Sequence, residues 1–320
     1  MTTLVTGGAG FIGHHLIKEI IKNDDVICVD NLSTSSNRTI KELQSLSPRH
    51  MFTFIPLDVC DQIINFKFNK CYHLACPASP VQYRKYPYDV LKTCTIGMFN
   101  VIESCRRSNA RMLFTSSSEV YGDPEIIPQS EVYWGNVNPI GERACYDEGK
   151  RAGEAIMINS NINYSIARIF NTYGPGMNSN DGRVVSEFII SALLDKPIKV
   201  HGAGDQHRCF CYVDDTVSAL IKLMKSDEKG PINIGNNRTF ITINKLAELI
   251  KDLTNSKSEI IHTAPDKDDP KDRLPRIDLA KDKLDWEPTI DLESGLKETI
   301  KYYEKILNDS QEQCFFSSIL

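Results

Sequence analysis

Short apolar runs alternate with amphipathic stretches through the first half of the chain. Residues 3–6 (TLVT) predict a short strand, and Leu16, Ile17, Ile20 and Ile21 then fall on one face of a helix. The same alternation continues, which is typical of an α/β protein whose parallel sheet is covered by helices on both faces. The pattern predicts strands at 26–30, 52–59, 71–75, 111–116 and 164–170, and helices at 88–107 and 144–160.

The second half alternates shorter elements in a less regular order. It predicts strands at 198–202, 208–213, 231–235 and 259–264, and helices at 185–194, 216–224, 242–253 and 292–307. We therefore expect a Rossmann-type doubly wound domain over 1–170, to which later segments return. A smaller α/β lobe should occupy most of 171–307. Residues 308–320 lack periodicity and are expected to form a flexible tail.

A glycine-rich turn joins the first predicted strand to the first helix. Gly7, Gly10 and Gly13 let the backbone approach a dinucleotide pyrophosphate, which the helix N-terminus also attracts. A tight turn without a ligand is the alternative. Asp30 ends the next apolar run about twenty residues later, where Rossmann folds place the carboxylate that binds the ribose. Such an acid repels a 2′-phosphate, so the sequence predicts NAD rather than NADP.

Composition and charge narrow the class of protein. The chain has 320 residues, of which 41% are hydrophobic and 25% charged, as in ordinary globular proteins, and its net charge of −5 gives no sign of nucleic-acid binding. No apolar run approaches the roughly 18 residues of a membrane span, and no signal peptide precedes the first strand. We expect a cytoplasmic protein whose ten cysteines are thiols. Cys209 and Cys211 lack the companions of a zinc site, so no metal is predicted.

Tyr146 and Lys150 are four residues apart on a predicted helix and therefore share one face. An ammonium beside a phenol lowers the phenol pKa. The pair can then take a proton from an alcohol while hydride leaves for a nicotinamide. This spacing also arises by chance in solvent-exposed pairs, but here it follows a dinucleotide turn.

Polar side chains follow the predicted strand 111–116. Ser116, Ser117, Ser118 and Glu119 stand at its carboxyl end, where open α/β sheets bind ligands. Such hydroxyls can orient a sugar alcohol, although a capped turn is the simpler explanation. The second half adds Arg183, Arg208 and Arg273, each of which is either a phosphate ligand or a solvated surface charge.

Seven stretches in order make the chain similar to the extended short-chain dehydrogenase/reductases that act on nucleotide sugars. Within that group it resembles the UDP-glucuronate decarboxylases. The stretches are 73–80 (HLACPASP), 115–124 (TSSSEVYGDP), 133–141 (YWGNVNPIG), 145–151 (CYDEGKR), 167–175 (ARIFNTYGP), 181–186 (DGRVVS) and 285–288 (DWEP).

This resemblance implies a redox-neutral reaction. UDP-glucuronate is oxidised at C4 by bound NAD, loses carbon dioxide as a 4-keto acid, and is reduced to UDP-xylose. It implies that Tyr146 is the base and then the acid, that Lys150 tunes it and holds the nicotinamide ribose, and that Ser117 and Ser118 bind near C4. Glu119 and Arg208 match positions linked to decarboxylation.

The resemblance also assigns binding positions and an assembly. Asn171, Arg183 and Arg273 match contacts to the uridine diphosphate, and a homodimer would pack through 88–107 and 144–160. Further cofactor positions are Phe11, Ile12, Asn31, Leu32, Thr34, Asp58, Val59, Leu74, Lys92, Thr115 and Thr172. Further substrate positions are Ser79, Tyr83, Asn100 and Val184.

Position 118 separates the alternatives. Sugar 4,6-dehydratases resemble this stretch but carry Asp-Glu where this chain has Ser118-Glu119, and 4-epimerases lack the Glu. A non-catalytic NAD-binding module should have lost Tyr146 or Lys150, but this chain has both residues. The chain departs from the decarboxylases at Gly176, where an Arg is usual, and at His207 and Cys209, which flank Arg208.

Overall fold

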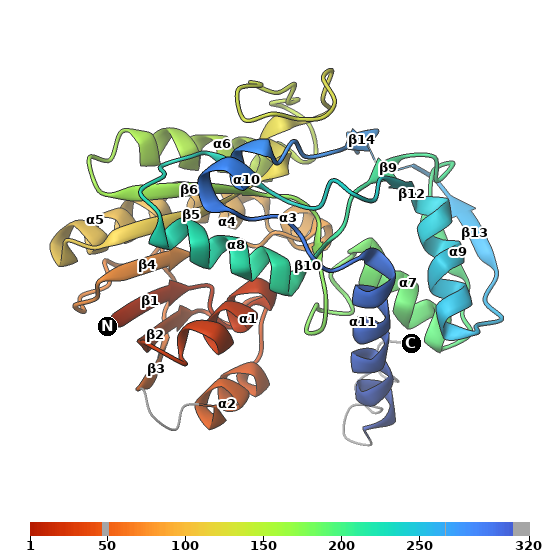
Figure 1. Ribbon diagram of the computed structural model, residues 1–320, viewed down its shortest axis with the longest axis horizontal. Coiled ribbons are helices and arrows are strands. Elements are labelled where there is room, and N and C mark those ends of the chain that lie inside the picture. The colour runs from red at the N-terminus through yellow and green to blue at the C-terminus, as the bar shows by residue number, and fades with distance from the viewer. Residues whose placement is uncertain (47–50, 266, 310–320) are drawn as a thin grey trace.

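A seven-stranded parallel sheet forms the centre of the computed structural model, which describes residues 1–46, 51–265 and 267–309 (Figure 1). All six strand pairings are parallel, and the strand order reverses on either side of β1, so the Rossmann-type prediction is confirmed. In spatial order the strands are β11 (Ile232–Ile234), β6 (Tyr164–Ile169), β5 (Arg111–Ser117), β4 (Lys70–His73), β1 (Thr2–Thr6), β2 (Asp25–Asp30) and β3 (Phe52–Pro56).

Helices cover both faces of this sheet. On one face α1 (Phe11–Ile20) packs against α2 (Asn37–Ser45) and α8 (Val213–Lys225). On the other face α4 (Pro87–Lys92), α5 (Met98–Ser108) and α6 (Ala144–Ile158) pack together, with the short α3 (Pro80–Lys85) before them. Because both faces are covered, β1 and β2 are almost completely buried.

The second half forms a smaller lobe beside the carboxyl edge of the sheet (Figure 1). Its helices are α7 (Val184–Leu193), α9 (Ile243–Thr254) and α11 (Leu292–Asn308), whereas α10 (Asp278–Leu284) returns to the main sheet and packs against β11 and α8. Its strands pair in three small sheets: β7 (Thr172–Tyr173) with β10 (Cys211–Tyr212), β8 (Ile198–His201) with β13 (Ile260–Thr263), and β9 (His207–Arg208) with β12 (Ile241–Thr242) and β14 (Asp272–Arg273).

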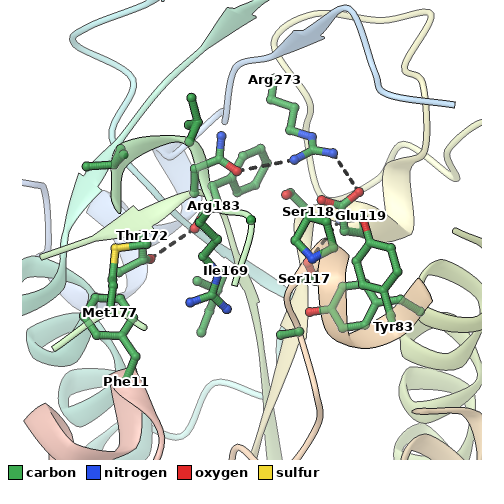
Figure 2. Close-up of a pocket in the computed structure, with 18 of the residues that line it drawn as sticks. Phe11, Tyr83, Ser117, Ser118, Glu119, Ile169, Thr172, Met177, Arg183 and Arg273 are labelled. Carbon is green, nitrogen blue, oxygen red and sulfur yellow. Dashed lines mark hydrogen bonds and ion pairs between the residues drawn. The ribbon is translucent and has the colours of Figure 1, made fainter. Parts of the chain in front are cut away.

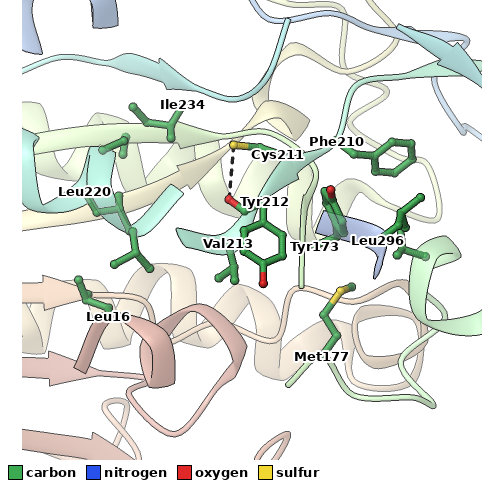
Figure 3. Close-up of a cluster of buried hydrophobic side chains, with 14 of the residues drawn as sticks. Leu16, Tyr173, Met177, Phe210, Cys211, Tyr212, Val213, Leu220, Ile234 and Leu296 are labelled. Atoms are coloured by element: carbon green, nitrogen blue, oxygen red, sulfur yellow. Dashed lines mark hydrogen bonds between the residues drawn. The ribbon is translucent and has the colours of Figure 1, made fainter. Parts of the chain in front are cut away.

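One continuous apolar core joins the two parts. Leu16 on α1 and Leu220 on α8 belong to the same buried cluster as Phe210 and Leu296 of the lobe (Figure 3). Tyr173 is buried within this cluster and donates a hydrogen bond to the carbonyl of Leu292 over 3.0 Å. The lobe is therefore held against the sheet by burial of apolar surface.

Several sequence predictions need correction. The predicted strand 208–213 is two short strands, and α8 already begins at Val213, since the chain bends between Arg208 and Cys211 to pair with different partners. The predicted helix 88–107 contains a π-helical turn, Thr93–Gly97. The pattern also missed α2 and α10, which bury few residues each.

Two further expectations meet the limits of the described residues. Positions 310–320 of the expected tail lie outside them, while α11 runs on to Asn308. Among the helices of the described part, none combines the length and the apolar character that crossing a bilayer requires.

Candidate active site

A cavity of about 340 Å³ lies where β1, β4 and β5 end, facing the lobe (Figure 2). The glycine turn follows β1, the loop around Cys76 follows β4, and the hydroxyl-rich stretch follows β5. Most predicted site residues meet here. They are Gly7, Gly10, Phe11, Ile12, Gly13, Leu74, Tyr83, Thr115, Ser117, Ser118, Glu119, Tyr146, Lys150, Asn171, Thr172, Arg183, Val184, Arg208 and Arg273.

The glycine turn forms a wall that tolerates no side chains. A Cβ on Gly13 would lie 2.4 Å from the carbonyl oxygen of Gly7, and a Cβ on Gly7 would lie 2.7 Å from the backbone nitrogen of Ala75. Gly7 also has φ +70°, a conformation that favours glycine. The backbone can therefore approach a phosphate group at the start of α1, as a dinucleotide requires.

Asp30 stands beside this wall, at the end of β2. Its Oδ2 accepts a hydrogen bond from the Ala9 N–H over 3.0 Å, and its Oδ1 accepts one from the Leu32 N–H over 2.8 Å. Ser35 donates a third bond to the same carboxylate over 2.9 Å. The carboxylate is therefore fixed next to the glycine turn, in the position expected of a ribose ligand.

Other predicted residues lie outside the cavity lining. Asn31 donates to Asp58 over 2.8 Å, at the carboxyl ends of β2 and β3. Asn100 donates to the carbonyl of Val59 over 2.9 Å, so it braces α5 against that loop instead of reaching the substrate cavity. The residues outside the lining are Asp30, Asn31, Leu32, Thr34, Asp58, Val59, Ser79, Lys92 and Asn100.

Tyr146 and Lys150 project from α6 into the floor of the cavity. The ammonium of Lys150 donates to the carbonyl of Thr115 over 2.8 Å and lies 5.7 Å from the centroid of the Tyr146 ring. The Tyr146 ring stacks on Tyr83, with centroids 5.6 Å apart. α6 and the carboxyl end of β5 therefore meet at the predicted acid–base pair.

The direction of the Tyr146 pKa differs from the prediction. Burial, with the nearby Cys76 thiol, raises the pKa of the phenol well above its ordinary value, although a hydrogen bond with Ser117 acts the other way. Lys150 alone was expected to lower it. The difference arises because Tyr146 is only 6% exposed, so desolvation outweighs the ammonium.

Glu119 lies at the centre of a buried ion-pair cluster. Its Oε2 accepts hydrogen bonds from Arg143 and, over 2.8 Å, from Arg273. Arg273 also reaches Asn171 over 3.4 Å (Figure 2). Burial opposes ionisation of Glu119, but the two guanidinium groups outweigh burial and hold its pKa below the ordinary value. Glu119 is therefore a carboxylate at neutral pH.

Sequence reasoning missed Arg143 and Asp269 in this cluster. Arg143 is the N-cap residue of α6 and lies three positions before Tyr146. This spacing of about one helical turn from Tyr146 is the feature of the sequence that could have indicated Arg143 as a site residue. Asp269 comes from a loop that looked merely charged, and it lies 3.2 Å from Arg143 and 2.8 Å from Arg208. The pairing of β9 with β14 sets Arg208 beside Arg273.

Arg208 is held mostly by the protein itself. Its guanidinium donates to the carbonyls of Pro270 over 2.6 Å and Lys271 over 3.0 Å, besides its ion pair with Asp269. Burial, together with Arg273, lowers the pKa of Arg208 to about 10. Its contacts therefore anchor the loop that carries Asp269 into the cavity.

Comparison with known proteins identifies the family. The model of the NAD dependent epimerase/dehydratase family matches residues 3–235. The chain belongs to this family. NAD is the cofactor, and the glycine wall with the fixed Asp30 carboxylate fits a dinucleotide that lacks a 2′-phosphate.

Relatives within and around this family share most of the chain. UDP-glucuronic acid decarboxylase 3 of Arabidopsis thaliana is 48% identical over 302 residues, covering 92% of this chain and 87% of the relative. UDP-glucuronic acid decarboxylase 1 of Xenopus tropicalis is 46% identical over 309 residues, covering 95% and 72%.

Solved structures agree with the fold. UDP-glucose 4-epimerase of Thermotoga maritima, with UDP-glucose, superposes with a TM-score of 0.88 at 28% identity, covering 96% of this chain and all of that one. UDP-glucuronic acid 4-epimerase of Bacillus cereus, with UDP-glucuronic acid and NAD, gives 0.83 at 25% identity, covering 95% and 99%.

Proposed function

We propose that this protein is an NAD-dependent carboxy-lyase that converts UDP-glucuronate into UDP-xylose and carbon dioxide. The charge of the cluster around Glu119 is the observation that carries the proposal. Three guanidinium groups face the carboxylates of Glu119 and Asp269 and, 3.9 Å from Arg143, the carboxyl of Asp147. Burial, with the charge of Glu119, raises the pKa of Asp147 to about 7, so the cluster has one excess positive charge whenever Asp147 is protonated. A substrate that brings its own carboxylate next to Glu119 neutralises this excess. The decarboxylase relatives support the same substrate.

Tyr146 carries the proton of the C4 hydroxyl in this proposal. When bound, NAD supplies a two-electron oxidant at C4 and returns the same electrons at the end of the cycle. Burial raises the Tyr146 pKa, so the phenol must be ionised before it can act as the base; the phenolate, hydrogen-bonded to Ser117, then accepts the proton of the C4 hydroxyl and gives it back in the last step. Lys150, fixed on the Thr115 carbonyl, holds a positive charge beneath the phenol and stabilises its ionised form.

Decarboxylation follows from the position of the ketone. A carbonyl at C4 is β to the carboxylate on C5, so the electron pair of the breaking bond moves into the carbonyl as carbon dioxide leaves. In this proposal Arg143 and Arg273 lie beside the substrate carboxylate, from which negative charge moves during the step. Both arginines also bind Glu119 and keep it ionised and fixed. The enolate that remains then takes a proton at C5 from a water molecule, which the Glu119 carboxylate can orient.

A buried hydroxyl without a hydrogen-bond partner supports substrate binding in this cavity. Among the described residues, the buried hydroxyls of Ser79 and Tyr83 have no hydrogen-bond partner. The Tyr83 hydroxyl lines the cavity and is available to the sugar or its carboxylate, since a buried hydroxyl is unfavourable without a partner, whereas Ser79 lies outside the lining. In this proposal residues 1–170 mainly bind the cofactor. Residues 171–307 mainly bind the uridine diphosphate, with Arg183 and Val184 in the cavity lining.

The experiment is product analysis with purified protein and UDP-glucuronate, with and without added NAD. We expect carbon dioxide and a UDP-pentose that mass spectrometry identifies. A product with the mass of UDP-glucuronate and no carbon dioxide would instead indicate a 4-epimerase, and loss of water would indicate a dehydratase.

We also propose a homodimer through the faces of α4, α5 and α6. The apolar side chains that are 40–58% exposed on and between these helices are Leu91, Ile96, Phe99 and Ile158. The same faces of a second copy of the chain would bury them. Light scattering should report a dimer for the natural chain and a monomer for Phe99→Lys. Ile140→Lys, at a 93% exposed position before α6, is the matched control.

A cytoplasmic location fits the nine described cysteines, all of which are free thiols.

A further inference from the structure

Two cysteine sulfurs meet beside the cofactor cavity. Cys76 lies in the loop after β4 and contributes to the cavity lining, whereas Cys94 lies in the π-helical turn Thr93–Gly97. Their Sγ atoms are 3.4 Å apart. A disulfide has an S–S length of about 2.05 Å, so the sulfurs need to approach by little more than an ångström.

The two thiols differ in their chemical character. Cys76 reaches the cavity, and its sulfur shares a hydrogen bond with the Cys94 sulfur in which either thiol can be the donor. That hydrogen bond, with the charge of Lys150, lowers the pKa of Cys76 to about 7 against the effect of burial. The same contact and burial raise the pKa of Cys94. Cys76 is therefore the nucleophile, and Cys94 is the partner that resolves it.

We propose that Cys76 and Cys94 form an oxidisable dithiol, which a peroxide converts into a disulfide that reversibly lowers the turnover of the enzyme. The proposed activity requires neither sulfur. The position of the pair between the cofactor cavity and α6 gives the disulfide a route to the active site.

The chemistry balances with hydrogen peroxide as the oxidant. The Cys76 thiolate attacks one peroxide oxygen, the O–O bond breaks, and the released hydroxide takes a proton to become water, leaving a sulfenic acid. The Cys94 sulfur then attacks the Cys76 sulfur. The S–S bond forms, the S–O bond breaks, and the hydroxide that leaves takes the Cys94 proton as a second water. The two thiols lose two electrons in total, which the peroxide accepts.

Closing the pair disturbs a tightly packed region. A Cβ on Gly149 would lie 3.2 Å from both Cβ and Sγ of Cys94, so Cys94 packs directly against α6 between Tyr146 and Lys150. On the other side, Ala75 precedes Cys76 and packs on the backbone of Gly7. If Cys94 moves to close the disulfide, it displaces α6 with Tyr146 and Lys150. If Cys76 moves, it displaces the glycine turn at Gly7.

The experiment treats the full chain with hydrogen peroxide, blocks the remaining thiols with an alkylating agent and maps disulfides by mass spectrometry. We expect a peptide pair linked through Cys76 and Cys94, lighter by two hydrogens than the reduced pair. Turnover should fall about tenfold or more, as expected for small displacements at an active site, and return with dithiothreitol.

Variants separate this pair from other oxidation. Cys94→Ser should keep its turnover after a peroxide exposure that inactivates the natural chain. Cys60→Ser is the matched control, because Cys60 contacts Thr93 of the same π-helical turn over 3.7 Å but does not contact Cys76. The control should lose turnover as the natural chain does. Two alkylated thiols at Cys76 and Cys94 after peroxide, a disulfide between any other pair, or equal inactivation of Cys94→Ser would overturn the proposal.

Discussion

Oε2 of Glu119 lies 2.8 Å from Nη2 of Arg273, although 154 positions separate the two residues in the chain. Arg143 binds the same oxygen, so a single carboxylate atom joins the end of β5, the start of α6 and β14. The ion pair is buried, and each partner depends on the other for a compensating charge.

Glu119→Gln tests whether this carboxylate acts in the reaction. The amide keeps the shape but cannot neutralise two guanidinium groups, so we expect kcat to fall about 10²-fold or more while KM changes little. Steady-state kinetics with UDP-glucuronate measure both constants. Glu148→Gln, at a half-buried position of α6 where the carboxylate pairs with Arg151, should behave as the natural chain. A change confined to KM would assign Glu119 to binding alone.

Tyr146→Phe tests the proton carrier. The ring and its stacking on Tyr83 are retained, but the hydroxyl that exchanges a proton with C4 is lost. Turnover should fall by about 10² or more, while calorimetry shows unchanged NAD affinity. Tyr164→Phe, at the start of β6, is the control. A near-normal rate in Tyr146→Phe would remove this residue from the mechanism.

Asp30→Asn tests the choice of cofactor. The carboxylate is fixed by the N–H groups of Ala9 and Leu32, and it should repel a 2′-phosphate. Binding titrations should show the preference for NAD over NADP reduced by about tenfold, which corresponds to one charge-assisted hydrogen bond. Asp61→Asn, at an exposed position, should leave the preference unchanged. Unaltered selectivity in Asp30→Asn would mean that another residue sets it.

The parts of the site that the sequence predicted are those that depend on local spacing. Gly7 to Gly13, Asp30, and the Tyr146–Lys150 pair each follow from one strand, turn or helix, and their positions could be read directly. The cluster around Glu119 could not, because the pairing of β14 with β9 brings Arg273 to Glu119 and brings the loop with Asp269 to Arg143 and Arg208. Two-residue strands carry no periodic signal, so neither this pairing nor the bend before α8 was predictable.

Desolvation was equally hidden from the sequence. The Tyr146 pKa was expected to fall because Lys150 is four residues away, yet burial by side chains from other elements raises it. Asn100 was expected in the substrate site, but its amide is used by the carbonyl of Val59. A residue type and its spacing indicate a possible role, while burial and competing partners are set by the tertiary structure.

Asp147 gives a prediction on stability and pH. Burial, with the charge of Glu119, raises the pKa of the Asp147 carboxyl to about 7, and its Oδ1 has no hydrogen-bond partner among the described residues. In the unfolded chain this group titrates near pH 3.9. Between these values the folded state holds a proton that the unfolded state has released. Stability therefore falls as pH rises from about 4 to 7 and then levels off.

Asp147→Asn should remove this pH-dependent loss. The amide keeps the size of the side chain and carries no charge. The free energy of unfolding of the variant, measured in denaturant, should therefore rise relative to that of the natural chain. The gain should be small near pH 4 and on the order of 4 kcal/mol at pH 8. Glu142→Gln, at an exposed position just before α6, should show no such trend. A difference between Asp147→Asn and the natural chain that stays constant from pH 4 to pH 8 would contradict the raised pKa, because a neutral contact effect does not change with pH.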